Sequence, residues 1–169
     1  MQSETQRNLV VFRLNDHLAA FPLDAVDRIR PMAALARPPS LPSLLEGFLI
    51  ERDSATAVLR LDRLLNLPPQ SPGLYSMLIV FKETCAVLVD RVLEIRPVDA
   101  SLWLPLQEPD SFNGCTEATV RLPDEWKPIP VLSPRKVLLE KERAVLKEFQ
   151  QITEERLAEW RQIMGAEPA

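Results

Sequence analysis

Residue types that usually carry catalysis or bind metals are sparse in this sequence of 169 residues. His17 is the single histidine, and the two cysteines, Cys85 and Cys115, lie far apart with no Cys-x-x-Cys pair. The common zinc, iron–sulfur and haem sites need more ligands than these residues supply. The four glycines are also too widely separated to form a dinucleotide-binding or phosphate-binding loop. We therefore expect no catalytic residue, no metal site and no cofactor.

The individual candidates for chemistry favour structural roles. His17 follows Asn15-Asp16, a pair typical of turns, so we expect it to be an exposed hairpin residue. Cys85 lies in an apolar strand pattern and is expected to be buried, whereas Cys115 lies in a polar loop, where we expect exposure. No adjacent base or cation would activate the Cys115 thiol. A small hydrolase that uses Cys115 or a pair of aspartates is a less favoured alternative function.

The composition is that of a single globular domain. Hydrophobic residues make up 46% of the chain, enough for a sizeable core at this length. The net charge is −4, aromatic residues make up 6%, and no basic cluster occurs. Nucleic-acid-binding surfaces need a basic face with stacking rings, so we expect no nucleic-acid partner. The same features disfavour a small β-barrel that binds an oligonucleotide or another ligand, which is a lower-ranked alternative.

The sequence contains no segment that would direct or anchor it to a membrane. Its first eight residues are polar and lack the apolar run of a signal peptide. No window reaches the 18 or more apolar residues of a membrane span. We therefore expect a cytoplasmic protein without direct membrane insertion, which reaches membrane receptor arrays only through a partner.

Proline placement divides the chain into two parts. Fifteen of the 16 prolines lie at or before Pro134, whereas residues 135–164 contain neither proline nor glycine. Proline ends helices and central strands, so the first part must consist of short elements with frequent turns. Apolar and β-branched runs predict short strands within residues 9–14, 17–21, 26–30, 45–51, 55–61, 75–81, 84–89, 92–98, 118–122 and 127–132. Because 92–98 continues the pair before it, these ranges amount to about nine strands, and their regular spacing favours closed β-barrels or a sandwich.

The stretch from Pro134 to Met164 predicts one long helix. Ser133 is a good N-cap residue, and Pro134 is well placed at the first helical position. A stripe of apolar residues follows the helical period; it comprises Leu146, Phe149, Leu157, Trp160 and Met164, widened by Val145, Ile152 and Ile163. The other face carries charges of both signs and is expected to be solvated.

This helix is too long to lie wholly on its own domain. At about 1.5 Å per residue it would extend about 46 Å, whereas a compact domain of this size is about 36 Å across. We expect its last apolar residues, Leu157, Trp160, Ile163 and Met164, to overhang the domain. These four would pack against another chain, either a second copy or a partner. The alternative is a kink near Ile152-Thr153 that folds the tip back.

Four segments in order resemble the CheW-like family of chemotaxis coupling proteins. They are an opening hairpin and turn at residues 12–29, a run at 47–61, the strands at 77–81 and 87–95, and a final strand at 129–132. The clearest of them is Leu88-Val89-Asp90-Arg91-Val92-Leu93-Glu94-Ile95, which is similar to the family's L-V-D-x-V-x-E-V signature. The resemblance covers about residues 8–138.

The chain departs from the family pattern at several positions. Arg28 stands where the family often has glutamate, and Arg60 stands in place of an aspartate. Asp53 replaces a glycine and Ala57 replaces a proline. If the two arginines face a partner, the reversed charges require a partner altered to match. The sequence therefore resembles a divergent member of the family, for which an accessory chemosensory pathway is the alternative setting.

The resemblance implies a mainly β fold of two interleaved five-stranded β-barrels, to which this chain adds the long C-terminal α-helix. We expect a flexible N-terminus at residues 1–7 and a double β-barrel domain at 8–133. The helix follows at 134–164, and a flexible tail at 165–169. Asp90 is expected to order the turn between neighbouring strands.

The function that the resemblance implies is that of a non-enzymatic adaptor. Such proteins couple the cytoplasmic tips of methyl-accepting chemoreceptors to the regulatory domain of a histidine kinase, holding the receptor tip in a groove between the barrels. Carried over to this sequence, Val26, Ile29 and Arg52 are expected to line or support that groove, and Arg28 is a further expected partner-binding residue. For Val26 and Ile29, three positions apart, the alternative is a role in the core. The alternative is the same role in an accessory pathway that controls pilus motility or a second messenger.

Overall fold

The structure is a computed structural model that describes residues 6–51, 54–82, 85–104, 106 and 114–165; some side chains of the C-terminal helix are also outside the description. The first sheet runs in the order β8 (Arg91–Asp99), β1 (Gln6–Leu14), β2 (His17–Pro22), β11 (Ile129–Leu132), β10 (Thr116–Val120) and β9 (Trp103–Leu104). The second sheet runs β3 (Val26–Pro31), β6 (Met77–Phe81), β7 (Cys85–Val89), β5 (Ser54–Arg60) and β4 (Leu45–Glu51). Three short helices connect strands, namely η1 (Leu23–Ala25), α1 (Leu61–Leu64) and η2 (Ala100–Leu102), and the long helix α2 (Pro134–Met164) ends the fold.

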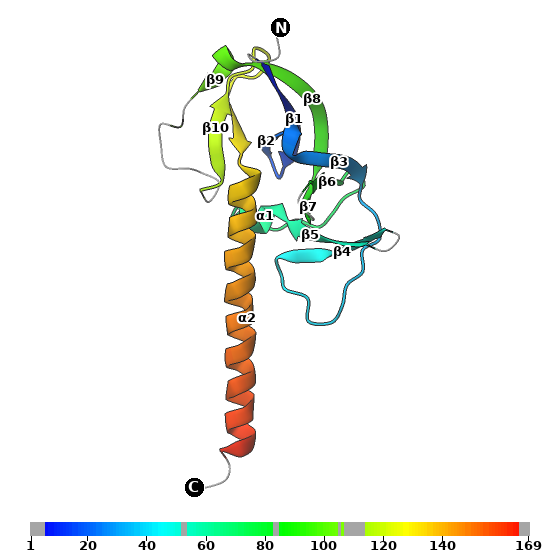
Figure 1. Cartoon of the computed structure of the whole chain (residues 1–169), viewed down its shortest axis with the longest axis vertical. Coiled ribbons are helices and arrows are strands. Elements are labelled where there is room, and N and C mark those ends of the chain that lie inside the picture. The colour runs from blue at the N-terminus through cyan, green and yellow to red at the C-terminus, as the bar shows by residue number, and fades with distance from the viewer. Residues whose placement is uncertain (1–5, 52–53, 83–84, 105, 107–113, 166–169) are drawn as a thin grey trace.

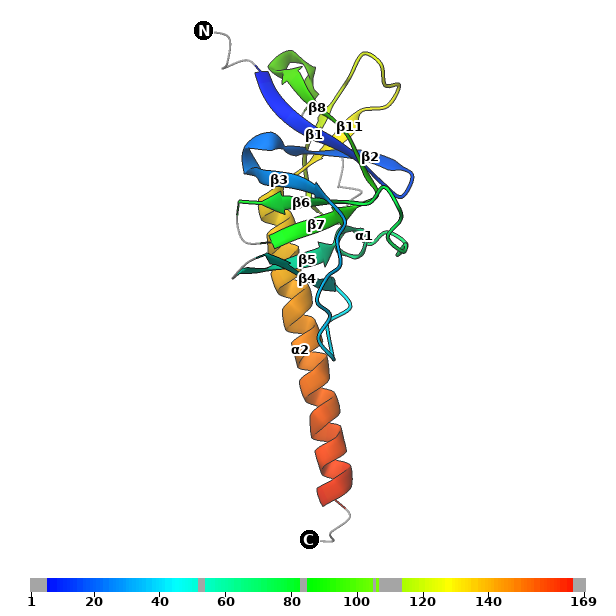
Figure 2. The same cartoon turned by 90° about the vertical axis from the view of Figure 1, so that its right-hand side faces the viewer.

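The two sheets are interleaved along the chain. The chain builds β1 and β2 in the first sheet, crosses to the second sheet for β3 to β7, and returns to the first for β8 to β11. Figures 1 and 2 show the first sheet above the second, with α2 passing both and leading away from them. Both sheets are mixed, because β2 pairs with β11 and β5 with β7 in parallel, while the other neighbours are antiparallel.

The expectation of two closed five-stranded barrels is wrong. The strands form one sheet of six and one of five, and within the described residues neither sheet closes through a backbone ladder. In the second sheet the outer strands β3 and β4 are joined by residues 32–44, where Pro38, Pro39 and Pro42 have no N–H to donate. This connection makes one isolated bridge, between Ala36 and Phe48. The first sheet gains its sixth strand because the two-residue β9 adds to β10.

Three apolar clusters hold the sheets together, and β1 contributes to two of them. Leu9 and Val11 pack inside the first sheet, whereas Val10, Phe12 and Leu14 point to the other face, into a central cluster between the sheets. This alternation explains why β1 is a continuous apolar run rather than an alternating one. The third cluster lies within the second sheet and comprises Leu49, Val58, Leu78, Val80, Ala86 and Leu88.

Helix α2 begins inside the fold and ends outside it. The Oγ of Ser133 accepts the N–H of Lys136 and Pro134 takes the first turn, as the sequence indicates. Val137 is fully buried in the central cluster, and Leu138 and Val145 pack against it. The helix then continues without interruption and projects away from the sheets (Figure 1), so its tip does not fold back. No helix in the described part of the chain is long and apolar enough to cross a membrane.

Candidate protein-binding surfaces

Strand β3 carries three of the four residues expected to contact a partner. Val26 is buried in the central cluster, and Ile29 is half-buried against the same cluster. Arg28 has an exposed side chain, which pairs with Asp27 and with Glu51 of β4. The fourth expected residue, Arg52, lies outside the described residues. The structure thus gives Val26 and Ile29 packing roles and leaves Arg28 at the surface.

Ion pairs join the two outer strands of the second sheet where the backbone ladder does not. Glu51 at the end of β4 accepts hydrogen bonds from Arg28 and, at 2.9 Å, pairs with Arg30, both on β3. Beside this carboxylate, Ile50 exposes its side chain to solvent. We call Asp27, Arg28, Arg30, Ile50 and Glu51 the β3–β4 edge. It combines charges of both signs with an exposed apolar residue, a composition suited to protein binding.

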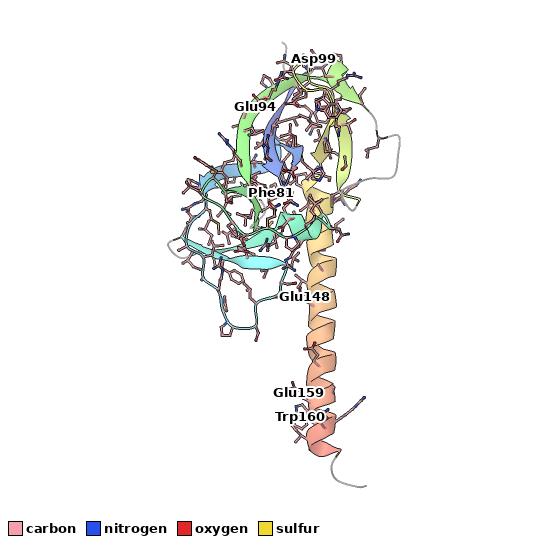
Figure 3. The ribbon with its side chains drawn as sticks, turned by 180° about the vertical axis from the view of Figure 1, so that it is seen from behind. Phe81, Glu94, Asp99, Glu148, Glu159 and Trp160 are labelled. Atoms are coloured by element: carbon pink, nitrogen blue, oxygen red, sulfur yellow. The ribbon has the colours of Figure 1, made fainter. Side chains whose placement is uncertain are left out.

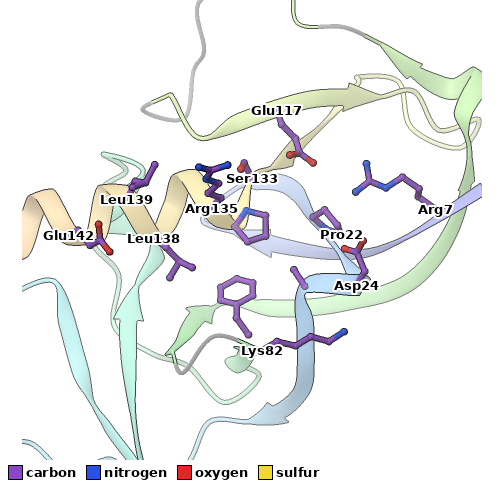
Figure 4. A pocket seen from close by; sticks show the side chains of 13 residues that line it. Arg7, Pro22, Asp24, Lys82, Glu117, Ser133, Arg135, Leu138, Leu139 and Glu142 are labelled. Carbon is purple, nitrogen blue, oxygen red and sulfur yellow. The ribbon is translucent and has the colours of Figure 1, made fainter.

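A pocket of about 680 Å³ lies where the two sheets meet the start of α2. Its walls carry three cations, Arg7, Lys82 and Arg135, and three acids, Asp24, Glu117 and Glu142. Its apolar lining is Pro22, Ala25, Phe81, Leu138 and Leu139. Figure 4 shows these residues arranged around the space, on β1, β2, η1, β10, the end of β6 and the start of α2. We call this pocket the inter-sheet groove.

The charged residues that line the inter-sheet groove are exposed, and one of them, Glu117, has a pKa shifted by partial burial. Burial raises the pKa of Glu117, although the nearby cations Arg7 and Lys136 lower it. Val26 borders the groove, because it follows Ala25 in the chain and pairs with Phe81. Arg28 and Ile29 lie farther along β3 and are not among the residues that line it. The structure therefore places Val26 at the border of the groove and Arg28 at the β3–β4 edge, whereas Ile29 packs against the central cluster.

Arg60 is placed in an internal ion-pair network. Its side chain is 14% exposed and contacts Asp62 at 2.9 Å and Glu46 at 3.2 Å. Asp62 also accepts the N–H groups of Arg63 and Gln70. Burial acts to raise the pKa of Asp62, but these hydrogen bonds and the Arg60 charge outweigh it, so its pKa is lowered. Arg60 therefore faces carboxylates of its own chain.

Asp90 orders two turns at once. Its N–H donates to the carbonyl of Arg13, and its carboxylate accepts the N–H of Asn15 at 2.7 Å. Asn15 has a left-handed φ of 53°, which the β1–β2 turn requires. Burial raises the pKa of Asp90, although the Asn15 hydrogen bond lowers it. Asp90 therefore holds the β1–β2 hairpin against the junction of β7 and β8.

The residues considered for chemistry have structural surroundings. Cys85 is buried as expected, but Cys115 is also buried, so the expectation that Cys115 is exposed is wrong. The reason is that the carbonyl of Cys115 accepts the N–H of Ser133, which draws the loop into the central cluster. His17 is exposed beside β1. In the described part of the chain, no group of three or more possible metal ligands comes together.

The last two turns of α2 expose large apolar side chains. Trp160 is 63% exposed, Ile163 74% and Met164 57%, and we call these three residues the α2 tip. The side chain of Leu157, expected to join them, is outside the described residues. Figure 3 shows Trp160 near the free end of the helix, far from the sheets. The hydrogen bond from Ser43 to Glu148, at 2.6 Å, lies well before the tip.

The resemblance led us to expect a groove between the barrels, but sequence reasoning did not find the residues that line the inter-sheet groove. Its charged residues come from β1, η1, β10, α2 and the residue after β6, and no local pattern links segments so far apart in the chain. The only available signal was the chain order of the resemblance, which predicts that two barrels meet but not which side chains line the junction. Sequence reasoning also did not predict that Ile50 of the β3–β4 edge is exposed, because the residue pattern of its strand does not show which face is covered.

Comparison with known proteins agrees with this architecture. The crystal structure of scaffolding protein TtCheW from Thermoanaerobacter tengcongensis matches with a TM-score of 0.69 at 20% sequence identity, over 75% of this chain and 88% of that chain. No curated protein gives a significant sequence match. The family model described as CheW-like domain matches residues 8–142, which include both sheets and the first turns of α2. The chain therefore belongs to the CheW-like domain family.

Proposed function

We propose that this protein is a non-enzymatic adaptor that couples chemoreceptor tips to the regulatory domain of a chemotaxis-type histidine kinase. The observation that carries the proposal is the match of the CheW-like domain family to residues 8–142, across both interleaved sheets. A structural neighbour is itself described as a scaffolding protein. In this role the protein works in the cytoplasm and is recruited to receptor arrays.

The β3–β4 edge supports this role as the partner-binding surface. It lies on two outer strands, each of which pairs with one neighbour in the sheet, and it presents Arg28 and Ile50 to solvent. Val26 and Ile29 pack beneath it in the central cluster and hold β3 in place. Exposed charges of this kind contribute mainly to partner choice and to the rate of association.

Arg28 favours an accessory chemosensory pathway as the setting. The arginine is satisfied within the chain by Asp27 and Glu51, so the reversed charge is accommodated by this fold. A partner that recognises this edge must then complement an arginine where the family often presents a glutamate. The output of such a pathway would be pilus motility or synthesis of a second messenger.

The test is binding of the full chain to two purified probes, a receptor tip fragment and a kinase regulatory domain from the same genome. Arg28→Glu is expected to weaken at least one complex about tenfold or more, because a like charge replaces a complementary one. Arg37→Glu is the matched control, since Arg37 is also an exposed arginine paired with a glutamate. Failure of the unaltered chain to bind either probe would refute the adaptor role. Equal losses in both variants would refute the placement of the site.

A further inference from the structure

The α2 tip and the inter-sheet groove lie on the same face of one helix. Glu142 lines the groove, and Trp160 follows it by 160 − 142 = 18 residues, which is about five full turns. Leu139 also lines the groove, and Met164 follows it by 164 − 139 = 25 residues, about 20° short of seven turns. The exposed tip is therefore in line with the groove, about 27 Å farther along α2.

This arrangement makes the helix face self-complementary. One end of the face is a hollow with an apolar lining, and the other end carries three exposed apolar side chains. If two copies pair their α2 helices in opposite directions so that Glu142 lies level with Trp160, Leu139 lies level with Ile163, because 142 + 160 = 139 + 163. The tip of each copy then reaches the groove of the other copy. A single two-fold axis relates the two contacts, so the assembly is a closed dimer.

We propose that the chain forms a two-fold symmetric dimer in which antiparallel α2 helices insert each tip into the inter-sheet groove of the other copy. The family match ends at Glu142, so the tip is an addition beyond the matched residues. The inference does not depend on the adaptor role, because it needs no receptor or kinase.

Charge favours a second copy as the occupant of the groove. The C-terminal end of a helix carries partial negative charge, and the groove lies at the opposite, N-terminal end of α2, beside Arg7, Lys82 and Arg135. The acids of the groove complement Arg161 of the incoming tip, and its cations complement Glu159. Antiparallel pairing thus brings unlike helix ends and unlike side-chain charges together.

The contact area is of the size that a specific dimer needs. In this register residues 138–164 of the two helices overlap over about 40 Å, and at about 10 Å wide they cover about 400 Å² of projected area per copy. The walls of a groove of about 680 Å³ on each copy add to this. Specific interfaces bury about 800 Å² of accessible surface per partner, which is the same order.

The experiment measures the mass of the full chain in solution by light scattering and sedimentation over a range of concentrations. The unaltered chain is expected to be a dimer. Trp160→Glu is expected to raise the dimer dissociation constant at least tenfold, because it removes the buried indole and places a carboxylate level with Glu142 of the other copy. Trp126→Glu is the matched control, since Trp126 is 80% exposed on a loop outside α2, and it is expected to leave the dimer intact.

A zero-length carbodiimide cross-linker distinguishes the direction of pairing. In the proposed dimer, Lys82 in the groove of one copy lies within reach of Glu159 at the tip of the other, and mass spectrometry should find this link between copies. Within one copy the two residues are separated by much of the length of α2. A chain that is monomeric at every concentration would overturn the proposal. A dimer that lacks the link, or that survives Trp160→Glu unchanged, would overturn it as well.

Discussion

Arg60 and Asp62 form the most buried ion pair among the described residues, at 14% and 6% exposure. The pair is stabilised because each partner has further contacts, with Glu46 on the arginine and two backbone N–H groups on the aspartate. A buried pair of this kind adds little relative to apolar residues, but removing one partner leaves an uncompensated charge. The network therefore fixes the end of β5 to α1.

Asp62→Ala is expected to lower the free energy of unfolding by about 3 kcal/mol, because the buried Arg60 loses one of its two carboxylate partners and the N–H groups of Arg63 and Gln70 lose their acceptor. Arg37→Ala breaks the exposed pair with Glu46 and is expected to cost about 0–1 kcal/mol. Urea unfolding of both variants measures the difference. Similar small effects in both would show that the network is as solvated as an ordinary surface pair.

The same pair gives stability a defined pH dependence. The pKa of Asp62 is lowered in the folded state, so its contribution is fully present above the unfolded pKa and is lost as pH falls through the lowered folded value. Stability of the unaltered chain should therefore decline from about pH 5 downward. This decline should be shallower in Asp62→Ala, and equal slopes would contradict the assignment.

Residue roles could be predicted only where they depend on local pattern. A core role is the alternative expectation for Val26 and Ile29, and the structure packs both against the central cluster. The role of Arg60 could not be predicted, because its partners include Glu46, which a strand hairpin brings beside it, and the carbonyl of Gln70. The burial of Cys115 likewise depends on Ser133, which a distant strand positions.

At the scale of elements, residues 32–44 fasten the open side of the second sheet. Their bridge from Ala36 to Phe48 lies directly beside Gly47, which has a φ of 156°. A Cβ at Gly47 would lie 2.8 Å from the carbonyl oxygen of Ala36 and 2.8 Å from the Cβ of Leu35. Real Cβ atoms do not approach backbone that closely, so the bridge depends on the missing side chain.

Gly47→Ala is therefore expected to lower the free energy of unfolding by about 1–3 kcal/mol through overpacking of the bridge. Gly73→Ala is the control, because nothing lies within 4 Å of a Cβ built there, and it should change stability by about 0.5 kcal/mol or less. Thermal unfolding followed by circular dichroism compares the two. Equal stability of both variants would mean that the connection moves aside without cost.

The positions of the strands could be predicted from sequence more readily than the pairing of one strand with another. Apolar and β-branched runs between prolines and turns mark where strands lie, and most of those expected are present within a few residues. Parallel pairing of β2 with β11 joins segments from opposite ends of the fold, and local sequence contains no signal for it. Whether the second sheet closes into a barrel depends on its outer strands, β3 and β4. Prolines lie in the connection between these strands, and side-chain ion pairs join them in place of backbone hydrogen bonds.

At the scale of the whole molecule, the chain weaves both sheets and the first turns of α2 around one central cluster. Phe21 of the first sheet stacks on Phe12 and meets Phe81 of the second sheet edge-on, at 5.2 Å and 5.0 Å between ring centres. Val137 of α2 is buried in the same cluster. Neither sheet is therefore a separate folding unit, and the start of α2 is part of the core rather than an addition at its surface.

Truncation separates the two halves of α2. A chain that stops after Gln151 keeps Val137, Leu138, Val145 and the Ser43–Glu148 hydrogen bond, so its melting temperature should stay within a few degrees of that of the full chain.

A chain that stops after Leu132 lacks all of α2 and exposes the central cluster. Burial of Val137 alone is worth about 1.5–3 kcal/mol, so this chain should melt far lower or fail to fold. Melting is best compared at the lowest usable protein concentration, because association would add to the stability of the full chain. Full stability after Leu132 would show that α2 is attached to an already complete domain.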